Sequence, residues 1–254
     1  MRIIFIRHGD PDYKNDGLTS KGQREAALLA KRVAQWKDIT QIYQSPLGRA
    51  QATAAPSLQA LGREAITYDW LQEFHNNKNK ICWDLLPEEF FNNTKYFDKD
   101  EWADSGLMKK GKVKQYYKTV CDGIDGILAQ YGYTRNKQGF YDVAAPVPNR
   151  NWSDPVYKYH LQAIKDEYPK ETTLVFFCHL GVIFAMLAYL TGLSPMQLWQ
   201  GFYIAPTSIT ILNSEERIAG QACFRVERLG DTNHLTNGGE PISSSGYFAE
   251  VFRE

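Results

Sequence analysis

The chain begins with MRIIFIRHGD (residues 1–10), in which an apolar run leads directly into an arginine and a histidine. Residues 2–7 alternate too little between apolar and polar side chains for an exposed strand. They are typical of a strand buried on both faces, as in parallel sheets. A strand that serves only packing needs a turn at its end, but not a guanidinium beside an imidazole. Arg7 and His8 are therefore the first candidates for chemistry.

A second stretch has the same arrangement near residue 179. An apolar run over 172–178 is followed by His179 and Gly181, and an apolar helix is expected over 182–190. In open α/β sheets, ligands collect at the carboxyl ends of the strands. If the two strands are parallel neighbours, His8 and His179 face the same crevice. The N-terminus of the following helix then offers an anion site there.

The pattern between these stretches predicts two helices. Ser20 and Gln23 have the spacing of a capping box for a helix of about 15 residues. Ser45-Pro46 suits an N-cap followed by proline at the first helical position of a second helix.

Short strands are expected at 42–43 and 66–68, and a later pair at 208–212 and 222–226 is close enough to form a hairpin. Strands that alternate with helices are typical of a largely parallel sheet with helices on both faces, and the hairpin makes that sheet mixed. We therefore predict an α/β fold, a three-layer sandwich around a mostly parallel mixed sheet.

Residues 75 to about 170 interrupt this alternation and are rich in aromatic side chains. A helix is expected there, and residues 136–139 resemble a turn between short strands. The predicted buried stripe of the helix consists of Val113, Tyr116, Val120, Ile124 and Ile127. We predict a single domain over 1–254 with a cap insertion over about 75–170.

The composition limits the partners. The chain has 254 residues with 29 basic and 29 acidic side chains, so no general charge attracts nucleic acid or an anionic membrane. The four cysteines have no paired spacing and are interpreted as reduced thiols. No apolar run is long enough to span a membrane. We expect a cytoplasmic protein that binds a small molecule.

Arg49 gives an independent indication of a bound anion. It falls in the first turn of the second predicted helix, where the helix dipole disfavours a cation by roughly 0.3–1 kcal/mol. Taken singly, such an arginine is usually solvated or paired with a carboxylate, and a histidine after a strand is usually structural. Convergence of Arg7, Arg49, His8 and His179 in one pocket instead indicates a phosphate site, because arginine forks match phosphate oxygens.

Several motifs together resemble the histidine phosphatase superfamily, which includes the cofactor-dependent phosphoglycerate mutases and their phosphatase relatives. They are Arg7-His8-Gly9, LTSKG at 18–22, SPLGRAQATA at 45–54, and His179-Leu180-Gly181-Val182-Ile183, in this order. The resemblance covers about 1–75 and 172–213.

This resemblance implies roles for five residues. His8 would be the nucleophile that takes the phosphoryl group, while Arg7, Arg49 and His179 would hold the phosphate oxygens. Glu73, in Leu71-Gln72-Glu73-Phe74, is the candidate general acid. A histidine nucleophile must be neutral, and nearby arginines would lower its pKa. A backbone carbonyl bonded to the other ring nitrogen would aim the attacking lone pair. No metal or other cofactor is implied.

The chain also departs from the family pattern. Asp10 replaces the usual glutamate, Lys14 stands where many members have asparagine, and 75–80 does not look like the glycine-rich segment of the mutases. We therefore favour a phosphatase that hydrolyses a phosphate monoester of a small metabolite through a phosphohistidine. His234 is expected to be structural.

Three alternatives remain at this level. One is phosphoglycerate mutase-type phosphoryl transfer, and another is a catalytically weak phospho-ligand sensor. The third is metal-dependent hydrolysis at His8, Asp10, Asp12 and His179, because alternate residues of an extended segment face one side.

Overall fold

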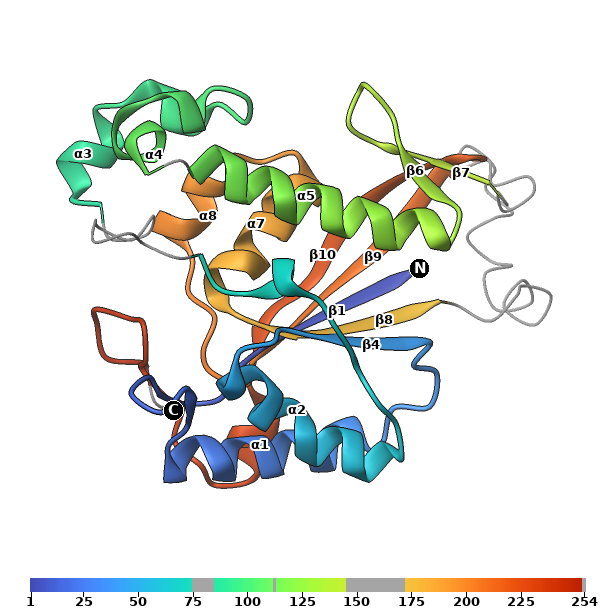
Figure 1. Cartoon of the computed structure of the whole chain (residues 1–254), viewed down its shortest axis with the longest axis vertical. Coiled ribbons are helices and arrows are strands. Elements are labelled where there is room, and N and C mark those ends of the chain that lie inside the picture. The colour runs from blue at the N-terminus through green and yellow to red at the C-terminus, as the bar shows by residue number, and fades with distance from the viewer. Residues whose placement is uncertain (75–84, 112, 145–171, 253–254) are drawn as a thin grey trace.

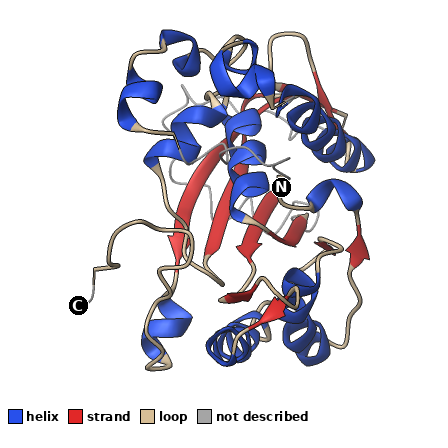
Figure 2. Ribbon diagram, turned by 60° about the vertical axis from the view of Figure 1, so that its left-hand side comes forward, coloured by secondary structure: helices blue, strands red, loops and turns tan. Residues whose placement is uncertain are grey.

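The computed structural model describes residues 1–74, 85–111, 113–144 and 172–252. Eight of the described strands form one large sheet with helices on both faces (Figures 1 and 2), which confirms the predicted α/β fold. In spatial order its eight strands are β5 (Ile66–Thr67), β4 (Gln41–Gln44), β8 (Thr173–Cys178), β1 (Arg2–Arg7), β9 (Ile209–Ile218), β10 (Gln221–Asp231), β7 (Tyr141–Val143) and β6 (Tyr133–Arg135).

The sheet is mixed, as predicted. Strands β5, β4, β8 and β1 run parallel to one another, whereas β9 pairs antiparallel with β1. The expected late hairpin is β9–β10, and both strands are longer than predicted. The expected turn at 136–139 joins β6 and β7, which extend the same sheet beyond β10. Two further short strands follow β1 in the chain, β2 (Pro11–Asp12) and β3 (Gly17–Leu18), and they form a separate antiparallel pair.

Strand β1 lies at the centre and contributes to two cores. Ile3 and Phe5 belong to the cluster on one face, and Ile4 and Ile6 belong to the cluster on the other. All four are at most 4% exposed, because successive side chains of a strand point to opposite faces and both faces are covered. The absence of apolar–polar alternation in the sequence therefore has a direct structural cause.

The helices fall into two layers. Figure 1 shows α1 (Ser20–Val33) and α2 (Gly48–Leu61) below the sheet. Above it lie α5 (Val113–Gln130), α7 (Leu180–Thr191) and α8 (Pro195–Gly201). The short α9 (Asn233–Asn237) packs against α1.

Both predicted helix caps are wrong. Thr19, not Ser20, caps α1, and its side chain accepts a hydrogen bond from the Gly22 amide. Helix α2 begins only at Gly48, after an N-cap at Leu47. Contacts outside the two helices account for the difference, because the Thr19 amide is bonded to the Asp10 carbonyl and the Ser45 hydroxyl contacts His179.

The predicted insertion is partly described. Helices α3 (Pro87–Phe91) and α4 (Gly106–Lys110) lie near one end of α5 (Figure 1), and short 3₁₀ turns join this region. The predicted stripe of α5 is correct except for Tyr116, which is 41% exposed. Its neighbour Tyr117 packs against Trp102 instead. Residues 75–84 and 145–171 lie outside the described residues, so the predicted domain and cap boundaries stay predictions.

Candidate active site

The register of the parallel strands brings the two histidines together. Arg7 on β1 is paired with Cys178 on β8, so His8 and His179 follow side by side. The His8 amide donates to the Cys178 carbonyl over 2.9 Å, and the two imidazole ring centroids are 5.1 Å apart. Strand β4 adds Ser45, whose Oγ lies 2.8 Å from His179 Nε2. The carboxyl ends of three neighbouring strands therefore meet at one place.

The His8 ring is oriented by its own loop. Its Nδ1 lies 2.8 Å from the carbonyl oxygen of Gly9, which can only accept, so Nδ1 carries the proton and Nε2 keeps its lone pair. Burial lowers the pKa of His8 well below its usual value, and the positive charges of Arg7 and Arg49 lower it further, although the Gly9 bond raises it. The imidazole is therefore neutral, with Nε2 available for attack.

Two buried side chains hold the loop that follows His8. Thr53 Oγ1 accepts from the Gly9 amide, and Glu25 Oε2 accepts from the Asp10 amide, each over 2.8 Å. Helix α1 lies so close to this loop that a Cβ on Gly22 would be only 2.3 Å from the Asp10 carbonyl oxygen. Burial raises the pKa of Glu25 to about 7.

Arg49 lies at the N-terminus of α2 and already faces a carboxylate. Its Nη1 donates to Asp16 Oδ1 over 2.6 Å, and Asp16 Oδ2 accepts from the Gly48 amide over 2.7 Å. The ordinary alternative for such an arginine, pairing with a nearby carboxylate, therefore holds in this structure. It does not exclude an anion, because Nη1 retains a second N–H and Nη2 two more.

Arg7 is held by backbone carbonyls. Its Nη1 donates to the Ile204 carbonyl over 2.6 Å, and its Nη2 donates to the Ser245 carbonyl over 2.9 Å. The guanidinium also lies 5.8 Å from the ring centroid of Tyr203. Arg7 is 2% exposed, and its Nε has no hydrogen-bond partner among the described residues. A buried N–H without an acceptor fits a ligand oxygen, because leaving it unpaired is costly.

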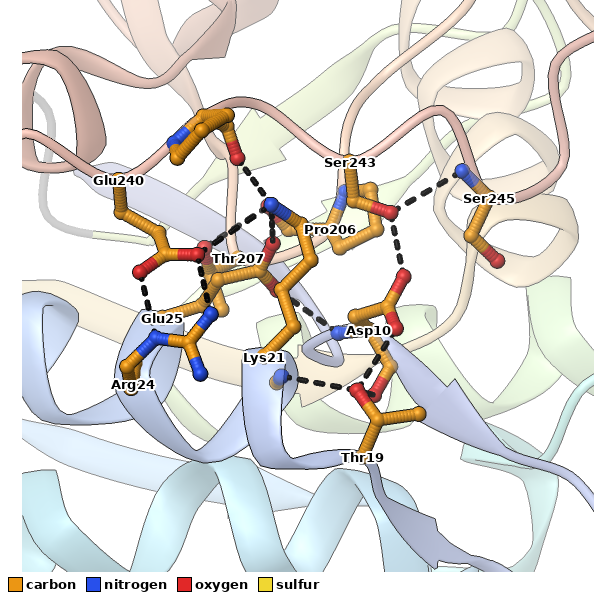
Figure 3. A network of polar contacts seen from close by, with 12 residues as sticks. Asp10, Thr19, Lys21, Arg24, Glu25, Pro206, Thr207, Glu240, Ser243 and Ser245 are labelled. Atoms are coloured by element: carbon orange, nitrogen blue, oxygen red, sulfur yellow. Dashed lines mark hydrogen bonds and ion pairs between the residues drawn. The ribbon is translucent and has the colours of Figure 1, made fainter.

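The C-terminal segment (residues 240–249) returns to this loop. Figure 3 shows Ser243 bonded to Asp10 and Glu240 beside Arg24 and Lys21 of α1. Asp10 therefore has one carboxylate oxygen bonded to Ser243, and its other oxygen accepts from Thr19 over 2.7 Å.

This geometry does not favour the metal alternative. Both carboxylate oxygens of Asp10 already accept hydrogen bonds, from Ser243 and Thr19. The Asp12 carboxylate accepts a hydrogen bond from the nearby Asn15 side chain. In the part of the chain that the structure describes, no group of three or more His, Cys, Asp or Glu side chains is arranged to hold a metal ion.

Glu73 lies at the N-terminus of α7. Its Oε2 accepts from the Gly181 amide over 3.1 Å, and its Oε1 accepts from the Phe74 amide over 3.0 Å. The helix end that the sequence offered as an anion site is therefore bonded to this carboxylate. Burial raises the pKa of Glu73 above its usual value, although both amides, Arg7 and Arg49 lower it.

His234 contacts the loop after β1 through Thr207, and it is not part of the neighbouring pair His8 and His179. Its Nε2 is 3.1 Å from Thr207 Oγ1. The Thr207 amide donates to the carbonyls of both Arg7 and His8, and Thr207 has a φ of 57°, which is unusual for a β-branched residue. Burial lowers the pKa of His234 to about 4. A supporting role fits this position.

Comparisons with known proteins indicate the family of the chain. The sequence profile of the histidine phosphatase superfamily (branch 1) matches residues 3–127. A probable phosphoglycerate mutase, GpmB of Yersinia enterocolitica, is 31% identical over 100 residues, which are 35% of this chain and 46% of that protein. The chain thus matches less than half the length of this relative.

Solved structures share the fold. A mycobacterial glucosyl-3-phosphoglycerate phosphatase superposes with a TM-score of 0.57 at 17% identity, covering 90% of this chain and 98% of that one. A phosphoserine phosphatase of Entamoeba histolytica superposes with a TM-score of 0.51 at 18% identity, covering 92% and 98%. At these identities the likeness concerns the fold alone.

Proposed function

Because the chain belongs to the histidine phosphatase superfamily, we propose that it hydrolyses a phosphate monoester of a small metabolite through a phosphohistidine on His8. The observation that supports this most strongly is the state of the His8 ring. It is buried, it is neutral, and Gly9 fixes the proton on Nδ1 so that Nε2 presents a lone pair next to His179.

In the first step, His8 Nε2 attacks phosphorus while the bond from phosphorus to the ester oxygen breaks in line with it. Arg7, Arg49 and His179 bind the phosphate oxygens. Glu73 gives its proton to the departing oxygen, so the product leaves as an alcohol. The raised pKa of Glu73 favours the protonated form that this step needs.

In the second step, the same carboxylate works as a base. Glu73, now ionised, takes a proton from water while the water oxygen attacks phosphorus. The bond from nitrogen to phosphorus breaks, inorganic phosphate leaves, and His8 and Glu73 return to their starting states. The arginines supply the positive charge that other phosphoryl-transfer sites take from metal ions, so this mechanism uses no cofactor.

The direct test is replacement of the nucleophile. We expect His8→Ala to abolish phosphate release from a generic ester such as p-nitrophenyl phosphate, and the wild type to carry an acid-labile phosphoryl group after rapid quenching. A matched control is His234→Ala, which removes a histidine that only supports the loop and should leave a measurable rate. Retained turnover in pure His8→Ala protein would contradict the proposal.

Phosphoglycerate mutase-type transfer is a second candidate, favoured by the partial match to GpmB. The segment at 75–80, where the sequence departs from the mutases, lies outside the described residues. A mutase given 3-phosphoglycerate and a bisphosphate primer forms 2-phosphoglycerate without free phosphate. A phosphatase releases phosphate, and a sensor would bind phosphate without either reaction.

We also propose that the protein is cytoplasmic. The described cysteines, Cys121, Cys178 and Cys223, are free thiols. No helix among the described residues combines the length and the apolar character needed to cross a bilayer.

A further inference from the structure

We infer, resting on the proposed function, that the leaving group of the substrate is a neutral aromatic alcohol, bound in a subsite beside the catalytic residues. A cavity of about 400 Å³ lies between α8 and the C-terminal segment. Its size is within the range of small-molecule sites. We call it the aromatic subsite, and its principal walls are Leu180, Trp199, Phe202, Tyr203, Tyr247 and Phe248.

The aromatic subsite adjoins the residues that are proposed to hold phosphate. Leu180 follows His179 directly in the chain. Tyr203 lies under the Arg7 guanidinium, and a Cβ on Gly246, another lining residue, would be 3.0 Å from Arg7 Nη2. A phosphoryl group bound between Arg7 and the two histidines would therefore have this cavity next to it.

The position of Glu73 indicates which part of the substrate occupies the aromatic subsite. The Gly181 amide donates to Glu73 Oε2, while the Gly181 carbonyl accepts from the Trp199 indole N–H over 3.0 Å. Phe74, the neighbour of Glu73, also contacts the Trp199 ring, with centroids 5.4 Å apart. The proton donor must lie at the ester oxygen that leaves. The carbon skeleton attached to that oxygen therefore extends towards Trp199 and into the aromatic subsite.

The chemistry of the walls selects the kind of group. Among the lining residues that the structure describes, none carries a charge. The polar side-chain groups are the Gln200 amide, the hydroxyls of Tyr203 and Tyr247, and the Trp199 indole N–H, which is bonded to the Gly181 carbonyl. A carboxylate or ammonium on the leaving group would lose hydration there without gaining an ionic partner. A flat apolar ring would lose little hydration and would gain contacts with several aromatic faces.

Exposed aromatic rings gather at this place. Phe202, Tyr247 and Phe248 are 48%, 45% and 90% exposed. Tyr203 and Tyr247 are stacked, with centroids 4.4 Å apart and planes at 17°. Clustered exposed apolar side chains mark interaction sites in soluble domains. A substrate ring that continues the stack would cover these faces.

The wall formed by the C-terminal segment is fixed in advance. The Tyr203 hydroxyl donates to the Ser243 carbonyl over 2.7 Å, and the Ser245 carbonyl accepts from Arg7. Figure 3 shows the further bonds of Ser243 and Glu240 to the loop after His8 and to α1. Because these contacts within the chain already order residues 240–245, ordering this part of the wall opposes ligand binding little.

Three esters test the inference, because they share unactivated primary alcohols and differ in the organic group: ethyl phosphate, benzyl phosphate and 4-carboxybenzyl phosphate. We expect kcat/KM for benzyl phosphate to exceed that for ethyl phosphate by about tenfold or more, and the added carboxylate to remove about tenfold. Equal values for benzyl and ethyl phosphate, or a preference for the carboxylate, would overturn the subsite but not the proposed function.

Variants of lining residues test whether the preference for benzyl phosphate arises in the aromatic subsite. Tyr247→Ala and Phe248→Ala should each lower the benzyl-to-ethyl ratio of kcat/KM by about threefold to tenfold. Phe252→Ala is the matched control, because Phe252 is an 83% exposed aromatic on the same terminal stretch that does not line the cavity. An unchanged ratio in both subsite variants would contradict the inference.

A binding measurement separates this inference from turnover. Phosphonates with a P–C bond cannot be hydrolysed, so calorimetry can compare 2-phenylethylphosphonate with ethylphosphonate in the wild type. We expect the aromatic compound to bind about tenfold more tightly. Equal affinities would overturn the subsite even if hydrolysis is normal. Tighter aromatic binding without release of phosphate from any ester would instead contradict the proposed phosphatase.

Discussion

Asp16 lies between the Arg49 guanidinium and the first amide of α2, at hydrogen-bond distance from both. This carboxylate places a negative charge where the sequence leads one to expect a bound anion. A phosphate group held by Arg49 must therefore share the arginine with Asp16. The pairing lowers the cost of burying Arg49 in the free protein, and it opposes phosphate binding.

Asp16→Asn should strengthen phosphate binding. Removal of the carboxylate takes away like-charge repulsion, so the inhibition constant of inorganic phosphate should fall by about threefold to tenfold. The same change should destabilise α2 by about 0.3–1 kcal/mol, because its N-terminus loses an anion. Inhibition kinetics and thermal unfolding measure the two effects. Asp12→Asn is the control, and weaker phosphate binding in Asp16→Asn would show that Asp16 orients Arg49 for the ligand.

Glu73→Gln should lower kcat/KM far more for some substrates than for others. If Glu73 protonates the leaving oxygen, kcat/KM for an alkyl phosphate should fall by about 10²–10⁴-fold, whereas p-nitrophenyl phosphate should be nearly unaffected because its leaving group needs no proton. The ratio kcat/KM reports the first step only. Equal losses for both esters would assign Glu73 a role in binding.

Glu25→Gln should flatten the pH dependence of stability. The pKa of Glu25 is about 7 in the folded chain and near 4.5 when unfolded, so the folded state holds more protons between these values. Stability from this group is full below about pH 4.5 and is lost as the pH rises through about 7. The shift corresponds to at most about 3 kcal/mol. Denaturant unfolding at pH 5 and pH 8 tests this, with the exposed Glu64→Gln as control.

Gly246→Ala should weaken the phosphate site for every substrate. The new Cβ would lie 3.0 Å from Arg7 Nη2, at a residue whose φ is +79°. We expect kcat/KM to fall by about tenfold for ethyl phosphate, which is too small to fill the aromatic subsite that Gly246 also lines, because Arg7 acts on the phosphoryl group. Gly239→Ala is the control for backbone strain, since its φ is +68° and nothing lies within 4 Å. A similar loss in both variants would remove Arg7 as the cause.

The parts of the fold that could be predicted are those with a local signal. Residues 2–7 and 172–178 are apolar runs that end in histidine, and parallel pairing of such strands puts their carboxyl ends together. The positions of His8 and His179 follow from that pairing. The predicted helix caps are wrong, because the Thr19 backbone is bonded to the Asp10 carbonyl and its side chain caps α1, whereas the Ser45 side chain contacts the distant His179.

The rest of the site depends on contacts that leave no pattern in the sequence. Asp16 lies in a turn and resembles any polar loop residue until Arg49 is seen beside it. Glu25 and Thr53 lie on helices and become functional supports only because those helices pack under the His8 loop. The segment at 240–249 is composed like an ordinary linker, and its bonds to Arg7 and Asp10 exist only in the folded chain.

The bonds of Arg7 also have a consequence for biosynthesis. Its carbonyl partners are 197 and 238 residues further along the chain, so they leave the ribosome long after β1. Contacts of such high sequence separation form slowly, because the loop must close before they contribute. A nascent chain therefore holds His8 and Arg7 without a working centre until Ser245 has been synthesised, and activity should begin only after that point.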